Sequence, residues 1–342
     1  MGNPATVAVT DQSERNAEPV DMVGIGVSVW DQIFLVDRYP DEDSVVRSDH
    51  RLQTIGGGIT VAMATAAKLG CNAVLLDRLG YDDASTQIIE SLHRAGVNDG
   101  LLQRCQGATA SVASIWSAEK GGTRTIVFSP GRDIDLRWEE RYVETVAAAK
   151  LLHLSGRHLD ASLQAIAIAK RSGTRVSYDG GAYRYRDSIL PLVRQADILI
   201  VARQFAEAML AASKDGNTDV DQSLSPESLA THLFDTTSAG IVGVTAGVDG
   251  SWFVSAGGPD CRGESWHQPA FSVDKVVDTT GCGDVFHGAF LAAIARGQDP
   301  KSASRCAAHV AAINATAVGG LAFETSQLDI RLMGWRSSGK RF

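Results

Sequence analysis

Short apolar segments rich in β-branched residues alternate along this chain with Ala-rich segments of helical length. Strands that are apolar throughout are typical of parallel sheets, and parallel neighbours need a crossover that is usually a helix. The alternation therefore predicts an α/β fold of three layers, with a mostly parallel sheet between two layers of helices. The expected strands are 22–29, 73–76, 151–154, 175–178, 197–201 and 240–245, and the expected helices include 58–69, 84–95, 161–170, 205–212, 226–234 and 301–317.

Two regions contain strand-like pieces with no helix between them. These pieces are 34–36 with 45–47, around a Tyr-Pro-Asp turn, and 111–116 with 124–128, around a Lys-Gly-Gly turn. They suit a small accessory sheet better than the main core. We expect this second sheet, formed roughly by residues 32–55 and 108–130, to act as a lid. No linker or repeat divides the chain, so we expect one domain over 21–335, after a disordered polar tail at 1–20.

The composition is that of an ordinary globular protein and excludes several classes of function. The 342 residues are 44% hydrophobic and 21% charged, and 32 basic against 40 acidic residues give a net charge of −8. The lack of a Lys and Arg block argues against nucleic-acid or anionic-membrane partners. The longest apolar stretch, 196–202, is broken by Asp197 and is too short to span a bilayer.

The cysteines indicate a reducing compartment. They are odd in number, widely spaced and without a C-x-x-C pair, which argues against a disulfide framework or a structural zinc site. The first twenty residues also lack the apolar run of a signal peptide. We therefore expect a soluble, cytoplasmic enzyme. The cysteines are Cys71, Cys105, Cys261, Cys282 and Cys306.

The stretch 277–286 carries the strongest signal for chemistry. It reads Val-Asp-Thr-Thr-Gly-Cys-Gly-Asp-Val-Phe and leads into an Ala-rich helix that ends at Arg296. Glycines at the start of a helix expose backbone N–H groups at the positive end of the helix dipole, which forms an anion site. Asp284 lies in the first turn of that helix. From the spacing alone it is either a general base beside a phosphate or a simple helix cap.

These residues resemble the C-terminal signature of the PfkB (ribokinase-like) family of sugar and nucleoside kinases. The likeness covers nearly the whole chain after residue 22. Within the family, 35–44 and 152–157 are similar to stretches of ketohexokinases, and 285–289 is similar to bacterial sulfofructose kinases. The resemblance implies a ribokinase-like three-layer αβα domain with a small β-sheet lid.

The resemblance also implies roles for particular residues. Asp284 would be the general base, and the backbone N–H groups of Gly281, Cys282 and Gly283 would form the anion hole. Asp31, Gly57, Gly58 and Arg157 match the sugar-binding half of the family. Thr245, Gly247 and Gly250 match the turn beneath the ATP phosphates and adenine. Asp278 and Thr280 fall where some members bind a monovalent cation.

Several positions depart from the family pattern. The Asn-x-x-Glu motif that organises Mg²⁺ in many members is absent at 202–205, as it is in ketohexokinases, so Mg²⁺ would be held by ATP oxygens and water. Gly58 and Val61 stand where ketohexokinases carry Asn, so two amide contacts to sugar hydroxyls are missing. Cys282 replaces the usual Ala, and a nucleophilic thiol is the alternative reading. Arginine is the best planar partner of an anion. An acidic sugar or one of different configuration is therefore the expectation from the cluster Arg132, Arg157 and His158, to which Tyr183 or Arg184 could be added.

The sequence thus predicts transfer of the γ-phosphoryl group of ATP to a primary hydroxyl of a ketohexose or a derivative of one. The implied cofactors are ATP and Mg²⁺, with K⁺ as in some relatives. A nucleoside kinase and a non-catalytic sugar or nucleotide sensor are the alternatives. The partners would be small molecules, with no nucleic acid or membrane, and a homodimer could form through the lid sheet, whose exposed edges need covering.

Overall fold

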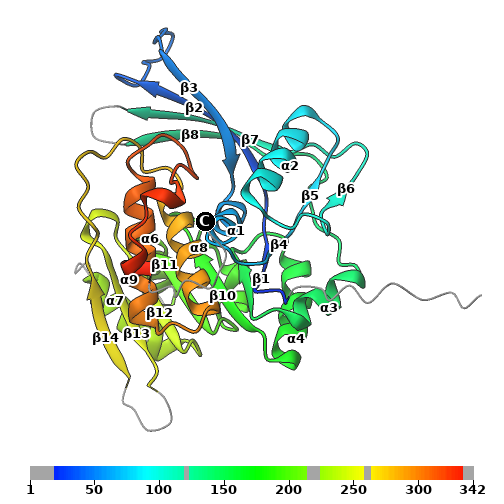
Figure 1. Cartoon of the computed structure of the whole chain (residues 1–342), viewed down its shortest axis with the longest axis vertical. Helices are drawn as coiled ribbons and strands as arrows, with labels where there is room; N and C mark the ends of the chain where they lie inside the picture. The colour runs from blue at the N-terminus through cyan, green and yellow to red at the C-terminus, as the bar shows by residue number, and fades with distance from the viewer. Residues whose placement is uncertain (1–18, 119–122, 214–223, 258–262, 334–342) are drawn as a thin grey trace, which may run out of the picture.

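The computed structural model describes residues 19–118, 123–213, 224–257 and 263–333. The predicted disordered tail at 1–20 falls almost entirely outside the described residues. Figure 1 shows two sheets, a large one through the body of the molecule and a small one along the top of the view.

The large sheet is mostly parallel, as the alternation of segments predicts. Within the described residues its strand order is β14-β13-β12-β11-β10-β9-β1-β4. Only β13 runs against the other strands, so its pairings with β12 and with β14 are antiparallel. Neither β13 nor β14 was predicted, because the two strands form a hairpin outside the strand–helix alternation. The strands are β1 (Met22–Ile25), β4 (Ala73–Leu76), β9 (Leu151–Leu154), β10 (Arg175–Gly180), β11 (Ile198–Ala202), β12 (Ile241–Thr245), β13 (Ser251–Ser255) and β14 (Glu264–Gln268).

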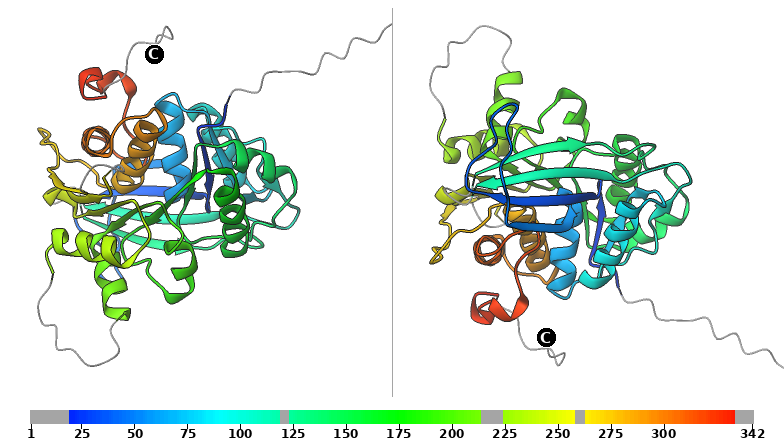
Figure 2. Two further views of the ribbon diagram at one scale, coloured as in Figure 1. Left: turned by 90° about the horizontal axis from the view of Figure 1, so that it is seen from below. Right: turned by 90° about the horizontal axis from the view of Figure 1, so that it is seen from above.

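Helices cover both faces of this sheet, which Figure 2 shows edge-on. In β11, Ile198 and Ile200 point into one apolar core, and Leu199 and Val201 point into the other. Successive strand residues face opposite sides, so a strand covered on both faces is apolar throughout. The first core is closed by α1 (Gly58–Lys68), α2 (Asp83–Ala95), α8 (Cys282–Ala295), α9 (Pro300–Asn314) and α10 (Ile330–Met333). The second is closed by α3 (Arg141–Ala148), α4 (Leu159–Ser172), α5 (Leu190–Val193), α6 (Arg203–Ala212) and α7 (Pro226–Thr236).

The small sheet has the strand order β3-β2-β7-β8. Its strands are β2 (Val29–Val36), β3 (His50–Gly56), β7 (Ser111–Ala118) and β8 (Arg124–Ser129), and a separate pair is formed by β5 (Arg78–Leu79) and β6 (Gln103–Arg104). The predicted strand at 22–29 is wrong in its extent: it ends at Ile25, and Val29 already belongs to β2. The predicted strand at 45–47 is also wrong. Leu35 pairs with His50, which leaves 45–47 in the connecting loop with Val45 93% exposed.

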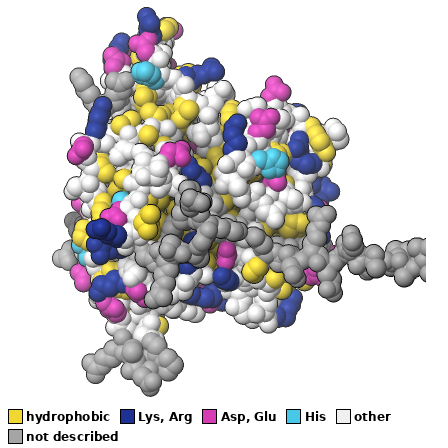
Figure 3. Space-filling view, in the orientation of Figure 1, with side chains coloured by type: hydrophobic (Ala, Val, Ile, Leu, Met, Phe, Trp, Pro, Cys, Tyr) yellow, Lys and Arg dark blue, Asp and Glu magenta, His cyan; other side chains and the backbone are white. Residues whose placement is uncertain are grey.

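The described part of the chain has no helix long and apolar enough to cross a membrane. Acidic and basic side chains are interspersed over the face drawn in Figure 3, with no broad area of one sign.

Candidate active site

The loop before α8 turns sharply at Gly281. Its φ is 70°, a left-handed conformation that favours glycine, and a Cβ there would lie 2.3 Å from the carbonyl oxygen of Gly320. Of the three predicted anion-hole amides, the N–H of Cys282 donates to the Thr279 carbonyl at 3.3 Å. Those of Gly281 and Gly283 have no acceptor among the described residues. A Cβ at Gly283 would meet no atom within 4 Å, so space is open in front of this turn.

Asp278 holds this loop in place through hydrogen bonds to its carboxylate. Its buried carboxylate accepts hydrogen bonds from the N–H and hydroxyl of Thr280, at 2.9 and 2.7 Å, and from the N–H of Gly319 at 3.0 Å. Oδ1 is therefore engaged within the loop and Oδ2 by Gly319, and this second contact holds the segment at 319–320 against Gly281. The cation-binding roles of Asp278 and Thr280 stay predictions.

The carboxylate of Asp284 meets two side chains that sequence analysis gave no catalytic role. A Cβ built on Gly58 would lie 2.9 Å from Asp284 Oδ1, 3.0 Å from Arg184 Nη1 and 3.1 Å from Asp179 Oδ2. Burial raises the pKa of Asp284, Asp179 raises it further, and Arg184 opposes both. The missing side chain at Gly58 therefore leaves the room in which these three charged groups converge.

Asp179 is the penultimate residue of β10 and is buried, with 3% of its surface exposed. Its Oδ1 lies 3.2 Å from Nε2 of His287 on α8, and its Oδ2 has no hydrogen-bond partner and lies 3.9 Å from Arg184 Nη1. Burial disfavours the charge of Asp179, but the attraction of His287 and Arg184 outweighs burial and lowers its pKa. A polar residue at the carboxyl end of an apolar strand is the signal that could have identified Asp179.

Asp31 lies on β2 and is 7% exposed. Its carboxylate lies so close to Gly56 that a Cβ there would be 2.1 Å from Oδ2, and it accepts no hydrogen bond from the described residues. Burial, helped by the charge of Asp284, raises the pKa of Asp31 to about 7. The adjacent Gly57 has a φ of 91°, and a Cβ there would lie 2.2 Å from the carbonyl oxygen of Val27. Of the predicted pair of glycines, Gly57 is thus required by the backbone, whereas Gly58 leaves room for charged side chains.

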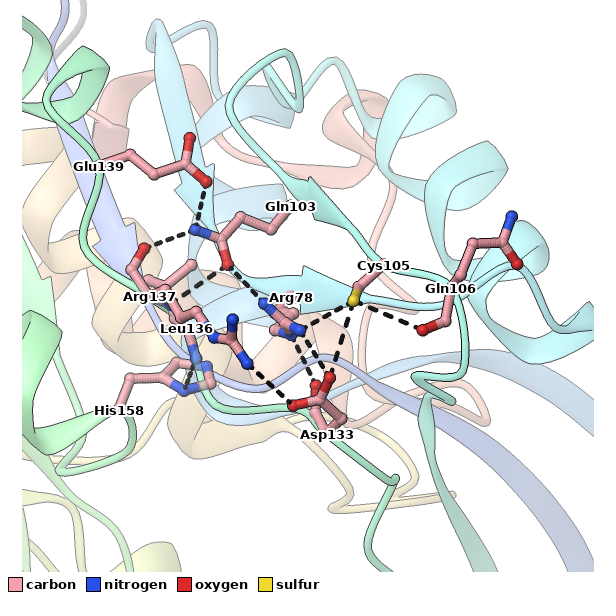
Figure 4. Close-up of polar contacts among 9 residues, drawn as sticks. All are labelled: Arg78, Gln103, Cys105, Gln106, Asp133, Leu136, Arg137, Glu139 and His158. Atoms are coloured by element: carbon pink, nitrogen blue, oxygen red, sulfur yellow. Dashed lines mark hydrogen bonds and ion pairs between the residues drawn. The ribbon is translucent and has the colours of Figure 1, made fainter.

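His158 does not face the site, which corrects its place in the predicted arginine-rich cluster. Nδ1 of His158 accepts the N–H of Leu136, and Nε2 lies 3.1 Å from Asp77 Oδ1, with 1% of each side chain exposed. Both ring nitrogens are therefore engaged within the protein. Figure 4 shows the contact with Leu136 beside the polar network of Arg78. Tyr183 is 86% exposed.

The network in Figure 4 fixes the segment that carries Leu136. Arg78 donates to Asp133 Oδ2 at 2.6 Å and to Gln103 Oε1 at 3.3 Å, and Gln103 in turn accepts the N–H of Arg137. These contacts join β5 and β6 to the chain before α3. Because His158 is bound to that segment, its neighbour Arg157 projects from a rigidly held loop.

The predicted nucleotide segment follows β12. Gly247 and Gly250 have φ of 60° and 88°, and the turn between them is closed by the N–H of Ala246, which donates to the Gly250 carbonyl at 2.9 Å. A Cβ at Gly250 would lie 2.3 Å from the Gln268 carbonyl, so this glycine is required by β14. The Thr245 hydroxyl donates to the carbonyl of Val201 at 3.4 Å.

The thiol of Cys282 is not activated by its place at the start of α8. Burial raises its pKa to about 11, and Asp278 acts in the same direction while Asn314 opposes them. A protonated thiol is a weak nucleophile, which argues against the alternative of covalent catalysis by Cys282.

Comparisons with known proteins identify the family to which this chain belongs. Residues 22–326 match the profile of the pfkB family carbohydrate kinases. Fructokinase-1 of Oryza sativa subsp. japonica is 30% identical over 72% of this chain and 75% of its own length, and the ketohexokinase of Mus musculus is 22% identical over 86% and 95%. The crystal structure of a putative ribokinase from Agrobacterium tumefaciens has a TM-score of 0.77 at 23% identity and covers 92% of this chain and 98% of its own. The chain therefore belongs to the pfkB family of carbohydrate kinases and is a phosphotransferase that acts on a hydroxyl group.

Proposed function

We propose that this kinase transfers the γ-phosphoryl group of ATP to a primary hydroxyl of a ketohexose or a ketohexose derivative. The fructokinase and ketohexokinase relatives support a ketose acceptor. Relatives named ribokinase and ATP-dependent ribose-1-phosphate kinase match as well, so the relatives alone do not select one sugar.

One observation carries the proposal. The carboxylates of Asp31 and Asp284 are close enough for their charges to interact, and neither accepts a hydrogen bond from the described residues. A buried or half-buried carboxylate that accepts no hydrogen bond destabilises the folded protein unless a ligand supplies the donors. A polyhydroxylated acceptor provides hydroxyl donors for both. Asp31 would bind neighbouring hydroxyls, and Asp284 would bind the hydroxyl that reacts.

In the proposed reaction, the acceptor oxygen attacks the γ-phosphorus while its proton passes to Asp284. The bond between the γ-phosphorus and the bridging oxygen breaks, and ADP leaves. Backbone N–H groups of Gly281 and Gly283 at the start of α8 would stabilise the charge on the transferring group. Closure of the small sheet over the acceptor would exclude water, the competing nucleophile.

Magnesium would enter with the nucleotide. Among the described residues no group of three or more His, Cys, Asp or Glu side chains is arranged to hold a metal ion. Mg²⁺ keeps several waters and binds readily to substrate phosphates, so Mg-ATP is the expected co-substrate. For K⁺, the oxygens of Asp278 are already engaged, and no step of the reaction is assigned to this cation.

The test is the release of ADP from Mg-ATP with a panel of fructose, tagatose, sulfofructose, ribose and adenosine. We expect turnover on a ketose, and Asp284→Asn to lower kcat by about 10²–10⁴-fold while ATP binding by calorimetry is retained. Asp83→Asn makes the same change in the first turn of α2 and serves as the matched control. Undiminished turnover in Asp284→Asn would refute the general-base role, and binding of ATP without turnover on any member would favour a sensor.

A further inference from the structure

His287 is a buried polar side chain on a largely apolar helix. Its neighbours on α8 pack into the first core, among them Phe286, Phe290 and Leu291. His287 lies one turn after Asp284 and is 4% exposed, so the protein covers it on nearly all sides. A buried imidazole destabilises the folded state unless its polar atoms are used. The use of this ring is a contact with the candidate active site.

The partner of His287 is the carboxylate of Asp179. Nε2 of His287 lies 3.2 Å from Asp179 Oδ1, whereas Nδ1 is buried and has no hydrogen-bond partner among the described residues. A neutral imidazole carries one proton, and a nitrogen that faces a carboxylate holds it, so Nε2 donates to Oδ1. The ring of His153 lies beside His287, with centroids 5.5 Å apart. Burial and the nearby His287 lower the pKa of His153 to about 3, so this second ring is neutral and does not compete for Asp179.

The contact with His287 fixes the other oxygen of Asp179. Oδ2 has no hydrogen-bond partner among the described residues and lies 3.9 Å from Arg184 Nη1. It would be 3.1 Å from a Cβ on Gly58, at a point only 2.9 Å from Asp284 Oδ1. Because Oδ1 is bound to His287, the plane of the carboxylate is set, and Oδ2 faces the place where Arg184 and Asp284 meet.

Arg184 is the group whose position depends on Asp179. Its aliphatic stem lies over Gly181, where a Cβ would be 2.9 Å from Arg184 Cδ. Its guanidinium is shared between the carboxylates of Asp179 and Asp284. The place of this positive charge beside Asp284 therefore depends on where Oδ2 of Asp179 points. A small displacement would change both the strength of the base and the charge that meets the transferring phosphoryl group.

We propose that His287 is a positioning residue for phosphoryl transfer, which acts by fixing the carboxylate of Asp179. Asp179 in turn holds the guanidinium of Arg184 beside Asp284, where the proton of the acceptor hydroxyl arrives. Stability alone does not account for such a pair, because apolar side chains of the same volume commonly stabilise a core as well or better. This inference rests on the proposed base Asp284, and it holds for any acceptor sugar.

The experiment measures the release of ADP from Mg-ATP with the acceptor that the wild type turns over best. We expect His287→Leu to lower kcat by about 100-fold and to leave the KM of both substrates nearly unchanged, because the ring contacts neither. His287→Gln should restore most of the lost kcat, since an amide N–H can take the place of Nε2. Once Asp179→Asn is present, adding His287→Leu should lower kcat little further.

The matched control is His309→Leu. His309 is a buried histidine of α9 whose Nε2 accepts the N–H of Asp329, away from the site. The change should lower the urea midpoint of unfolding and keep kcat. It shows whether a lost histidine contact in the core is enough to reduce turnover.

Stability measurements separate positioning from a merely structural role. His287→Leu should lower the urea midpoint, because it leaves the buried Asp179 without its hydrogen-bond donor. Adding Asp179→Asn removes the buried charge and should restore part of the midpoint while kcat stays low. A kcat that recovers with the midpoint would overturn the inference, as would wild-type kcat in His287→Leu. If His287→Leu alone does not fold, a double variant much slower than Asp179→Asn would overturn it as well.

The outcomes distinguish this inference from the proposed function. Turnover on ribose or adenosine and not on a ketose, with the expected behaviour of the His287 and Asp179 variants, would refute the proposed acceptor and support the inference. A collapse of kcat in Asp284→Asn together with an unchanged kcat in His287→Leu would support the proposed base and overturn the inference. Absence of turnover on every acceptor would refute both.

Discussion

Replacing Asp31 by Asn should stabilise the free protein while impairing catalysis. Asp31 is buried and accepts no hydrogen bond from the described residues, and burial raises its pKa from 3.8 to about 7. The folded state therefore holds the Asp31 proton to a higher pH than the unfolded chain does. Unfolding releases that proton between about pH 4 and pH 7, so the free energy of unfolding falls as the pH rises through this window.

The size of the effect follows from the two pKa values. Because Asp31 ionises more readily in the unfolded chain, its titration lowers the free energy of unfolding by about 4 kcal/mol near pH 8 and by about 2 kcal/mol near pH 5.5. Asn has nearly the same shape and does not ionise. The stability advantage of Asp31→Asn over the wild type should therefore widen by about 2 kcal/mol between these two pH values. Its kcat/KM should fall about 100-fold, because an amide replaces a charged acceptor of sugar hydroxyls.

Urea unfolding at both pH values measures the advantage, and ADP release measures the activity. Asp77→Asn is the control, because it makes the same change in a carboxylate that accepts hydrogen bonds from Ser28, Arg78 and His158. It should lower the free energy of unfolding by about 1–3 kcal/mol at either pH, since it places an amide group against donors. A destabilised Asp31→Asn variant, or an advantage that does not change with pH, would refute the reasoning.

Three further predictions concern the α8 loop and the small sheet. Gly281→Ala should lower both thermal stability and kcat, because its Cβ would lie 2.3 Å from the Gly320 carbonyl oxygen. Gly283→Ala should leave the melting temperature unchanged, and equal melting temperatures of the two variants would argue against the steric reason. Cys282→Ala should keep most of the wild-type kcat, and a loss of more than about tenfold would indicate a chemical role for the thiol. In the wild type, Cys282 should react slowly with iodoacetamide at neutral pH, since burial raises its pKa to about 11. The exposed apolar edge strand β8 predicts a dimer by light scattering that Val127→Lys converts to monomers, and a monomeric wild type would contradict this.

Several parts of the fold could be predicted because their signals are local. The alternation of strands and helices identified the central strands of the large sheet, since a buried parallel strand is apolar throughout and its crossover helix has its own periodicity. The glycines of the α8 loop likewise indicated a turn into a helix, and the structure makes that turn at Gly281, whose φ is 70°. The strand expected at 45–47 was wrong because apolar character cannot say which segment pairs with β2, and the register with β3 decides that.

The composition of the candidate site depended on contacts between distant segments. Gly58 at the start of α1, Asp179 at the end of β10 and Asp284 on α8 converge on one point, and no spacing along the chain predicts this. His158 was expected near the acceptor. Its Nε2 instead lies 3.1 Å from the carboxylate of Asp77, which precedes it by 81 residues.

The sequence by itself therefore determined the class of fold and the turn from loop to helix that carries Asp284, because turn chemistry and hydrophobic periodicity act over a few residues. Only the tertiary structure decided which charged groups compensate one another. Arg184 acquires acidic neighbours and Arg157 does not, although both follow strands of the same sheet. Electrostatic compensation depends on distance in space and on burial, and both of these exist only once the chain has folded.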